Sequence, residues 1–205
     1  MKIFDQGILV VLSGPSGAGK GTVGSKILEK DKSFKLSVSA TTRSARVGEV
    51  EGVHYYFTTK SDFEKKIERG EMLEYAKYSE NYYGTPKSQV VNDLEAGINV
   101  ILEIEVKGAA QIKERYPDAV HILLLPPDYK TLESRLRGRN TNTEDDILRR
   151  LDQAKNEIKE FSLYDYVVIN DNGGAEETAR EIIDIVNSER HKTQRNQSIP
   201  SDFFA

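Results

Sequence analysis

A glycine-rich segment near the N-terminus carries a clear chemical signal. Residues 12–23 read LSGPSGAGKGTV, which fits the phosphate-binding pattern G-x-x-x-x-G-K-[ST] up to its last position. Backbone N–H groups of such a loop surround phosphate oxygens, and the positive end of the following helix assists them. Lys20 would reach the β- and γ-phosphates. The pattern predicts a nucleoside triphosphate site at Gly14, Pro15, Ser16, Gly17, Ala18, Gly19, Lys20, Gly21 and Thr22.

Position 21 departs from the pattern, because Gly21 stands where a magnesium-binding hydroxyl is expected and Thr22 follows one residue late. Magnesium keeps several waters and often relies on substrate phosphates with one or two carboxylates. A loop without the hydroxyl can therefore still work. Thr22 is either a donor to an α-phosphate or an ordinary first-turn residue. A glycine-rich connection with an incidental lysine is the plainer alternative, and the strand–loop–helix context disfavours it.

Two glutamates lie within the segment INVILEIEV at residues 98–106, which reads as a strand. Side chains alternate between faces in a strand, so Glu103 and Glu105 share one face. Both faces of a central parallel strand are normally apolar, and ligands bind at its carboxyl end. We therefore expect polar contacts to substrate, or for Glu103 a contact to magnesium through water. No residue is predicted as a direct metal ligand, and a solvent-facing edge strand remains the alternative.

Arginines and tyrosines gather in the segment SVSATTRSARVGEVEGVHYYF. Arg43 and Arg46 are three residues apart, and Tyr55 and Tyr56 follow downstream. Arginine binds phosphate with two parallel hydrogen bonds, so this group suits a phosphate monoester. Taken alone, a solvated basic turn beside aromatic packing explains the same residues.

The elements that must hold these groups form an alternating series. Short apolar runs predict strands at 8–12, 98–106, 119–125 and 166–169, and helical patterns lie at 19–30, 88–97, 107–116, 143–161 and 175–190. Strands alternating with helices indicate an α/β fold, here a three-layer α/β/α core with a parallel sheet built from about 1–37, 88–126 and 165–190.

Two segments interrupt this alternation. Residues 38–87 are rich in Tyr, Thr, Ser and Gly and predict an inserted mixed α/β lobe with one helix at 60–69. Residues 127–164 are charged and helical and predict a lid. The tail at 191–205 is polar and aperiodic, so we expect it to be disordered.

Composition narrows the function classes. The 205 residues carry a net charge of -4, which disfavours a dedicated nucleic-acid binder, and contain no cysteine. The apolar run at 8–12 is too short for a signal peptide or a membrane span. We therefore expect a cytoplasmic protein without nucleic-acid or membrane partners. The three histidines lie in no catalytic pattern and are expected to be structural or exposed.

Six ordered blocks between about residues 8 and 190 resemble guanylate kinases. They are GPSGAGK, SVSATTRSARVGEVEGVHYYF, EYAKYSENYYGTP, LEIEVKGA, RLRGRNT and YDYVVIND. The resemblance implies a P-loop kinase domain over 1–190 that transfers phosphate from ATP, with Mg²⁺, to GMP and to dGMP. Its inserted lobe would bind GMP.

The resemblance also assigns roles position by position. It implies a GMP-phosphate grip of Arg43, Arg46, Tyr55 and Tyr83, and guanine contacts from Ser39, Glu74, Thr85 and Glu105. On the ATP side it implies an adenine contact from Asn170 and lid groups Arg135, Arg139 and Arg150 over the phosphates. The expected catalytic set is Lys20, Arg43, Arg139 and Arg150, whereas Arg137 and Arg149 are expected to be solvated. Asn140 and Asn142 replace the family's usual glycine and glutamate, which bears on lid opening.

Two other functions fit the same fold. A non-catalytic interaction module of this family is disfavoured by the intact Gly19-Lys20 pair. A kinase acting on a ribose bisphosphate is disfavoured by Ser39, Glu74 and Glu105, because a sugar phosphate offers a set of guanine contacts nothing to bind.

Overall fold

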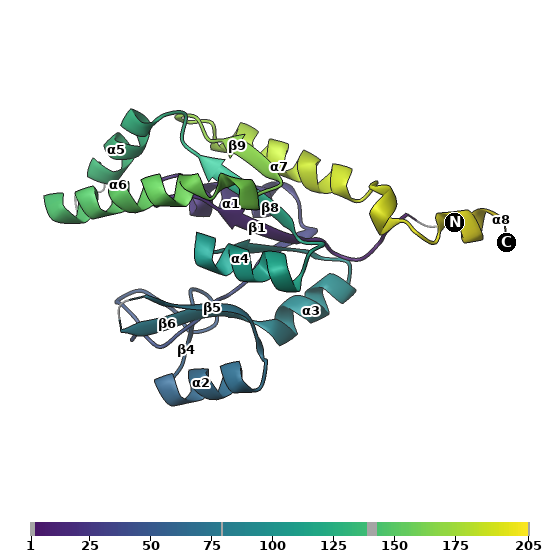
Figure 1. Cartoon of the computed structure of the whole chain (residues 1–205), viewed down its shortest axis with the longest axis horizontal. Helices are drawn as coiled ribbons and strands as arrows, with labels where there is room; N and C mark the ends of the chain where they lie inside the picture. The colour runs from purple at the N-terminus through teal and green to yellow at the C-terminus, as the bar shows by residue number, and fades with distance from the viewer. Residues whose placement is uncertain (1–2, 79, 139–142, 205) are drawn as a thin grey trace.

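A five-stranded parallel sheet forms the centre of the molecule (Figure 1). The structure is a computed structural model that describes residues 3–78, 80–138 and 143–204. The strand order is β2-β7-β1-β8-β9, and the bounds are Leu9–Ser13 (β1), Phe34–Leu36 (β2), Asn99–Glu103 (β7), Val120–Leu125 (β8) and Tyr166–Ile169 (β9). Strand β1 lies in the middle, so its carboxyl end is the switch point at which open α/β sheets bind ligands.

Helices cover both faces of this sheet, and β1 shows why. Its alternate residues Val10 and Leu12 pack toward α1 (Lys20–Lys30) and α7 (Ala175–Glu189), whereas Leu9 and Val11 pack toward α3 (Lys87–Glu95) and α4 (Val106–Arg115). A strand that is apolar on both faces needs a helical layer on each side. The predicted three-layer α/β/α architecture is confirmed.

The four predicted strands are present, with two corrections. The sheet contains a fifth strand, β2, which the sequence analysis missed because it is three residues long with Phe34 alone buried. The strand predicted at 98–106 ends at Glu103, and Glu105 is the N-cap residue of α4 instead. Because β7 lies between β2 and β1, the alternative of a solvent-facing edge strand is wrong.

The inserted lobe has a small sheet of its own, drawn below the core in Figure 1. Its order is β4-β3-β6-β5, and its elements are β3 (Ala40–Thr41), β4 (Tyr56–Phe57), α2 (Lys60–Glu68), β5 (Met72–Tyr78) and β6 (Asn81–Pro86). Phe63 of α2 is fully buried and stacks on Tyr82 at 5.2 Å between ring centroids. The lobe therefore holds its shape through a separate apolar cluster.

Two helices that pack together build the charged excursion, α5 (Tyr129–Arg137) and α6 (Glu144–Lys159), and the 3₁₀ turn η1 (Phe161–Leu163) follows. Leu132 and Leu136 pack against Ile147, Leu151 and Ala154 as a cluster distinct from the sheet core. The Thr143 side chain caps α6 by accepting from the Asp146 N–H, as its spacing predicts. Arg139, Asn140 and Asn142 lie outside the described residues.

The C-terminal segment differs from the expected disordered tail. It forms η2 (Thr193–Arg195) and α8 (Ile199–Phe204), which extend beside the N-terminus in Figure 1. Asn196 is buried, and its Oδ1 accepts from the Phe4 N–H at 2.8 Å while its Nδ2 donates to the Arg190 carbonyl. Polar composition suggested disorder, but these side chains pair with polar groups distant in sequence.

Candidate functional site

The glycine-rich loop joins β1 to α1 at the switch point. Gly14, Gly17 and Gly19 have positive φ, and a Cβ at Gly14 would lie 2.1 Å from the Leu124 carbonyl oxygen. This backbone path needs glycine at those positions. Gly19 is the N-cap of α1, so the loop ends at the positive end of that helix. The geometry is that of an anion-binding loop.

Lys20 and Glu103 meet at the first turn of α1. The Lys20 Nζ donates to the Gly14 carbonyl at 2.6 Å, so the lysine curls back over the loop. A Cβ at Gly21 would lie 3.7 Å from a Glu103 carboxylate oxygen. Glu103 is exposed. The loss of hydration beside the surrounding protein raises the pKa of its carboxyl group above the ordinary value, and the positive charge of Lys20 partly opposes this shift. Thr22 is exposed on the first turn of α1.

Two lid arginines reach the loop. Arg150 donates to the Ser16 hydroxyl at 2.8 Å, and Arg135 donates to the Ala18 carbonyl at 3.3 Å. Arg137 instead pairs with Glu133 and Glu144, and Arg149 pairs with Asp146 on the exposed side of α6. The lid thus presents Arg135 and Arg150 toward the phosphate loop and Arg137 and Arg149 away from it, and the roles that the resemblance implies for them stay predictions. The prediction for Arg139 falls outside the described residues.

Asn170 lies directly behind the phosphate loop. Its side chain is buried, and the amide Nδ2 donates to the Ala18 carbonyl at 2.7 Å while Oδ1 faces Thr178. Its own carbonyl accepts from Arg135 at 2.8 Å. These hydrogen bonds attach Asn170 to the back of the phosphate loop, and the adenine contact that the resemblance implies for it stays a prediction.

A group of side chains that we call the arginine cluster lies in the inserted lobe and consists of Arg43, Glu49, Tyr55 and Tyr83. Arg43 donates through Nη1 and Nη2 to the two oxygens of Glu49, both at 2.9 Å, and its guanidinium lies 5.5 Å from the Tyr55 ring centroid. The ion pair with Arg43 and a hydrogen bond from the Arg46 N–H lower the pKa of Glu49 to about 2. Nη1 also donates to the Ser44 carbonyl, and Tyr83 is a further hydrogen-bond partner of the Arg43 side chain.

Tyr55 and Tyr83 complete this cluster, with ring centroids 6.2 Å apart. Burial raises the pKa of Tyr55, so its hydroxyl stays a neutral hydrogen-bond donor. Arg46 is exposed beside Glu49, and Ser39 is half-buried where β2 leads into β3. Sequence reasoning missed Glu49, although it stands within the quoted block GEVEG.

Glu74 and Thr85 form a buried pair on β5 and β6. The Thr85 hydroxyl donates to Glu74 Oε1 at 2.8 Å, and Glu74 is 4% exposed. Burial raises the pKa of Glu74, and the nearby negative charge of Glu105 raises it further. The side chain and the backbone of Thr85 both hydrogen-bond to Glu74, and a buried carboxylate needs such donors on both of its oxygens to remain charged. Glu74 is therefore suited to a ligand that offers N–H groups.

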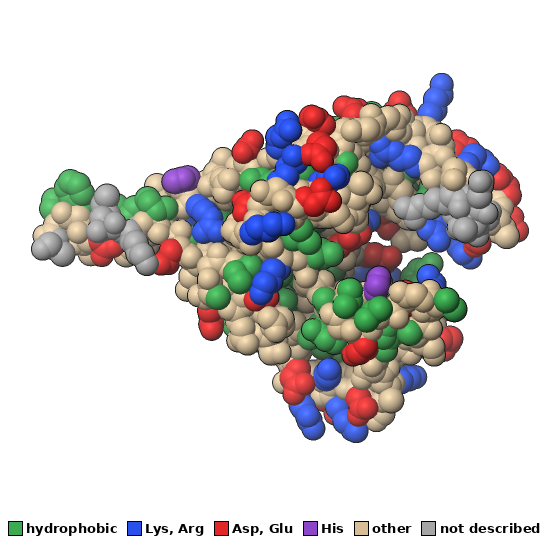
Figure 2. All heavy atoms as spheres, turned by 180° about the vertical axis from the view of Figure 1, so that it is seen from behind, with side chains coloured by type: hydrophobic (Ala, Val, Ile, Leu, Met, Phe, Trp, Pro, Cys, Tyr) green, Lys and Arg blue, Asp and Glu red, His purple; other side chains and the backbone are tan. Residues whose placement is uncertain are grey.

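Electrostatic interactions link the phosphate loop to the inserted lobe, and Figure 2 shows a cleft with acidic and basic side chains along its walls. The charge of Glu103 acts on both Lys20 and Tyr55, which places it between the loop and the arginine cluster. Burial raises the pKa of Glu157 on α6, and Glu157 also interacts electrostatically with Lys20 and Glu105. Glu157 lies in a helix whose charges suggested a solvated face, so no local pattern singled it out.

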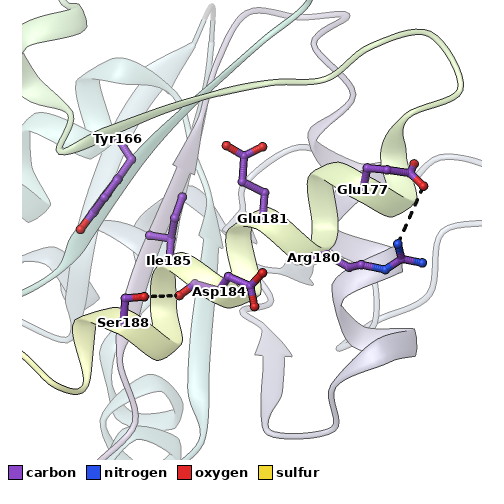
Figure 3. Close-up of a pocket in the computed structure, with 7 residues that line it drawn as sticks. All are labelled: Tyr166, Glu177, Arg180, Glu181, Asp184, Ile185 and Ser188. Carbon is purple, nitrogen blue, oxygen red and sulfur yellow. Dashed lines mark hydrogen bonds and ion pairs between the residues drawn. The ribbon is translucent and has the colours of Figure 1, made fainter.

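A separate shallow recess on α7 contributes none of the predicted residues. Figure 3 shows Tyr166 of β9 and six α7 side chains, three of them acidic, with Arg180 near Glu177 at 4.0 Å and the Ser188 hydroxyl donating to the Asp184 carbonyl.

The three histidines lie in different environments. His54 accepts a hydrogen bond from the Val50 N–H, His191 is exposed, and His121 is buried in β8.

A parallel sheet with a phosphate loop at its switch point, an inserted lobe and an arginine-bearing helical lid defines the nucleoside monophosphate kinase class of P-loop proteins. The guanylate kinase family profile matches residues 6–189. The chain is 48% identical over 199 residues to the guanylate kinase of Clostridioides difficile, covering 97% of this chain and 96% of the relative. It is 49% identical over 191 residues to that of Lactococcus lactis, covering 93% and 92%.

A solved structure agrees with these sequence matches. The guanylate kinase of Anaplasma phagocytophilum superposes with a TM-score of 0.76 at 34% identity, covering 95% of this chain and 92% of that chain. The chain belongs to the guanylate kinase family. Among the residues that the structure describes, no helix is long and apolar enough to cross a membrane.

Proposed function

We propose that this protein transfers the γ-phosphoryl group of ATP to GMP, giving ADP and GDP. The observation that carries the proposal is the arrangement of one cleft. A phosphate loop with Lys20 lies on one side, and the buried pair of Glu74 and Thr85 lies with Arg43 on the other. Such a cleft suits a triphosphate and a purine monophosphate held with their phosphates facing each other.

Guanine suits the buried carboxylate of Glu74. Guanine presents two donors side by side, N1–H and the exocyclic amine, and a carboxylate accepts from both. Adenine has an acceptor at N1 and would leave Glu74 without that partner while buried at 4% exposure. An unpaired buried polar group gives strong discrimination. Ser39, Thr85 and Glu105 would supply the remaining base contacts.

The transfer step needs positioning and charge neutralisation and no general base, because the acceptor phosphate oxygen is already deprotonated at neutral pH. Lys20, Arg139 and Arg150 would hold the γ-phosphoryl group, and Arg135 would lie against the loop. Arg43, with Arg46, Tyr55 and Tyr83, would aim the GMP oxygen. Closure of lobe and lid would exclude water as a competing acceptor.

Magnesium fits this donor set as the cofactor that arrives with ATP. Glu103 stands against Gly21 with a carboxylate oxygen 3.7 Å from the Cβ position, and no loop hydroxyl intervenes there. That position would hold a hydrated Mg²⁺ through its waters. When bound, Mg²⁺ would neutralise charge on the β- and γ-phosphates.

The proposal extends to dGMP, because the expected contacts are to base and phosphate and none is assigned to the 2′-hydroxyl. We place the activity in the cytoplasm, where ATP and GMP are available, and cell fractionation tests this placement.

A coupled ADP-release assay with GMP, dGMP, AMP, CMP, UMP and ribose bisphosphate tests the function. We expect turnover with the two guanine nucleotides, and preference for another acceptor would overturn the proposal. No turnover with any acceptor would favour an interaction module. Lys20→Ala should abolish turnover while GMP binding persists, and the matched Lys32→Ala, an exposed lysine on the Leu28 carbonyl, should behave as wild type. Loss of GMP binding in Lys20→Ala would refute the division of roles.

A further inference from the structure

The outer edge of β5 is paired with helix α4 rather than with another strand. Strand β5 is the last strand of the lobe sheet, and its register with β6 shifts between Met72 and Glu74. The edge of a sheet leaves backbone N–H and C=O groups without partners. Here Gln111 of α4 accepts from the Tyr75 N–H at 3.2 Å and donates to the Tyr75 carbonyl at 2.7 Å. The Gln111 amide thus forms the two backbone hydrogen bonds that a neighbouring strand would otherwise form with Tyr75.

Further contacts come from the same stripe of α4. Arg115 donates to the Leu73 carbonyl at 3.1 Å, so the backbone is tied on both sides of Glu74. Residues 108, 111 and 115 are spaced by three and four, which puts them on one helix face. At Gly108 the helix approaches the carboxylate itself, because a Cβ there would lie 2.5 Å from Glu74 Oε2.

From this arrangement we propose that Gln111 and Gly108 are positioning residues for Glu74 and set the selectivity for guanine. Neither residue would touch the nucleotide in this role. Gln111 fixes the backbone next to Glu74, and Gly108 leaves room for the carboxylate beside Thr85. The inference rests on the proposed function, because it concerns how well Glu74 meets the guanine edge.

Comparison of GMP with inosine monophosphate isolates this role, since the two differ by the exocyclic amine alone. A well-placed Glu74 makes the kcat/KM ratio of GMP to inosine monophosphate large. A change that lowers stability affects both substrates alike and leaves the ratio unchanged. A change that displaces Glu74 lowers the ratio, because the exocyclic amine of GMP then forms a weaker hydrogen bond with the Glu74 carboxylate.

Gln111→Met keeps the side-chain length and removes both hydrogen bonds to Tyr75. We expect the ratio to fall about tenfold, the value of one hydrogen bond to a charged group. The KM for ATP and the kcat with GMP should stay within about twofold of wild type, because the phosphate loop is untouched. Gln89→Met is the matched control, since that exposed amide donates to Asp93 on α3 and should leave the ratio unchanged.

Gly108→Ala tests the same idea from the other side. Alanine is a better helix former than glycine by about 1 kcal/mol, so helix propensity favours the variant, while its Cβ pushes against the Glu74 carboxylate. We expect the ratio to fall here too, with folding retained, so this variant carries the test if Gln111→Met does not fold. Unchanged ratios in both folded variants would overturn the inference. Failure of the proposed function would look different, because wild type would then not turn over GMP.

Discussion

His121 makes the stability of this protein sensitive to acid. Its ring lies in β8 at 0% exposure, and neither ring nitrogen has a hydrogen-bond partner among the described residues. Burial, assisted by the charge of Lys113, lowers the pKa of His121 from 6.5 to about 4, although Asp165 opposes the shift. Protonation therefore favours the unfolded chain, and the stability that the neutral ring provides above about pH 6.5 is lost as the pH falls toward 4.

The size of the effect follows from the two pKa values. With 6.5 in the unfolded chain and about 4 in the folded protein, His121 lowers the free energy of unfolding by about 2 kcal/mol between pH 7 and pH 5. The full loss below pH 4 is about 3 kcal/mol, at 1.36 kcal/mol per pKa unit. Other groups titrate in the same range, so a difference between two variants is the informative quantity.

Urea unfolding of wild type and His121→Leu at pH 7 and pH 5 measures this difference. Leucine has a similar volume and no polar atoms, so it removes the titration without a large cavity. We expect wild type to lose about 2 kcal/mol more than the variant between the two pH values. Equal losses would refute the reasoning and would mean that the ring stays neutral in the unfolded chain as well or finds a partner when protonated.

Three further predictions concern other parts of the chain. Glu49→Gln should raise the KM for GMP about tenfold in steady-state assays and leave the KM for ATP unchanged, because Arg43 loses its bidentate partner; a lower KM would mean that Glu49 competes with the phosphate. Asn170→Ala should raise the KM for ATP and not that for GMP, since the Ala18 carbonyl loses its donor; a higher KM for GMP would contradict this. Deletion of residues 191–205 should lower the free energy of unfolding by about 2 kcal/mol, because Glu189 loses Lys192 and Arg195 and Phe4 loses Asn196; an unchanged melting temperature would support the disordered tail instead.

The sequence alone predicted those parts of the fold that depend on residues close together in the chain. Gly14, Gly19 and Lys20 specify the loop because positive φ and the helix start depend on adjacent residues. Continuous apolar runs predicted both layers of helices around the sheet, since a strand that is apolar on both faces must be covered twice. The cap at Thr143 was likewise predictable from its spacing of three residues to Asp146.

Contacts between distant segments were decided by the tertiary structure. The Asn170 amide donates to the Ala18 carbonyl, 152 residues away, and no local pattern around either residue predicted this support for the loop. Glu157 faces the cleft because α5 and α6 pack through their leucines, which its own helix does not reveal. The pairing of Gln111 with Tyr75 depends on where α4 meets the lobe edge.

The physical reason for this division is the range of the interactions. Backbone preferences and hydrophobic periodicity act over a few residues, so the loop, the strands and the helix caps are encoded where they occur. The partner of a buried polar group is whichever atom packing brings to it, and packing depends on the whole chain. The sequence by itself therefore determined that this protein has a phosphate loop on an α/β sheet, and tertiary packing decided which side chains hold Glu74, Arg43 and that loop in place.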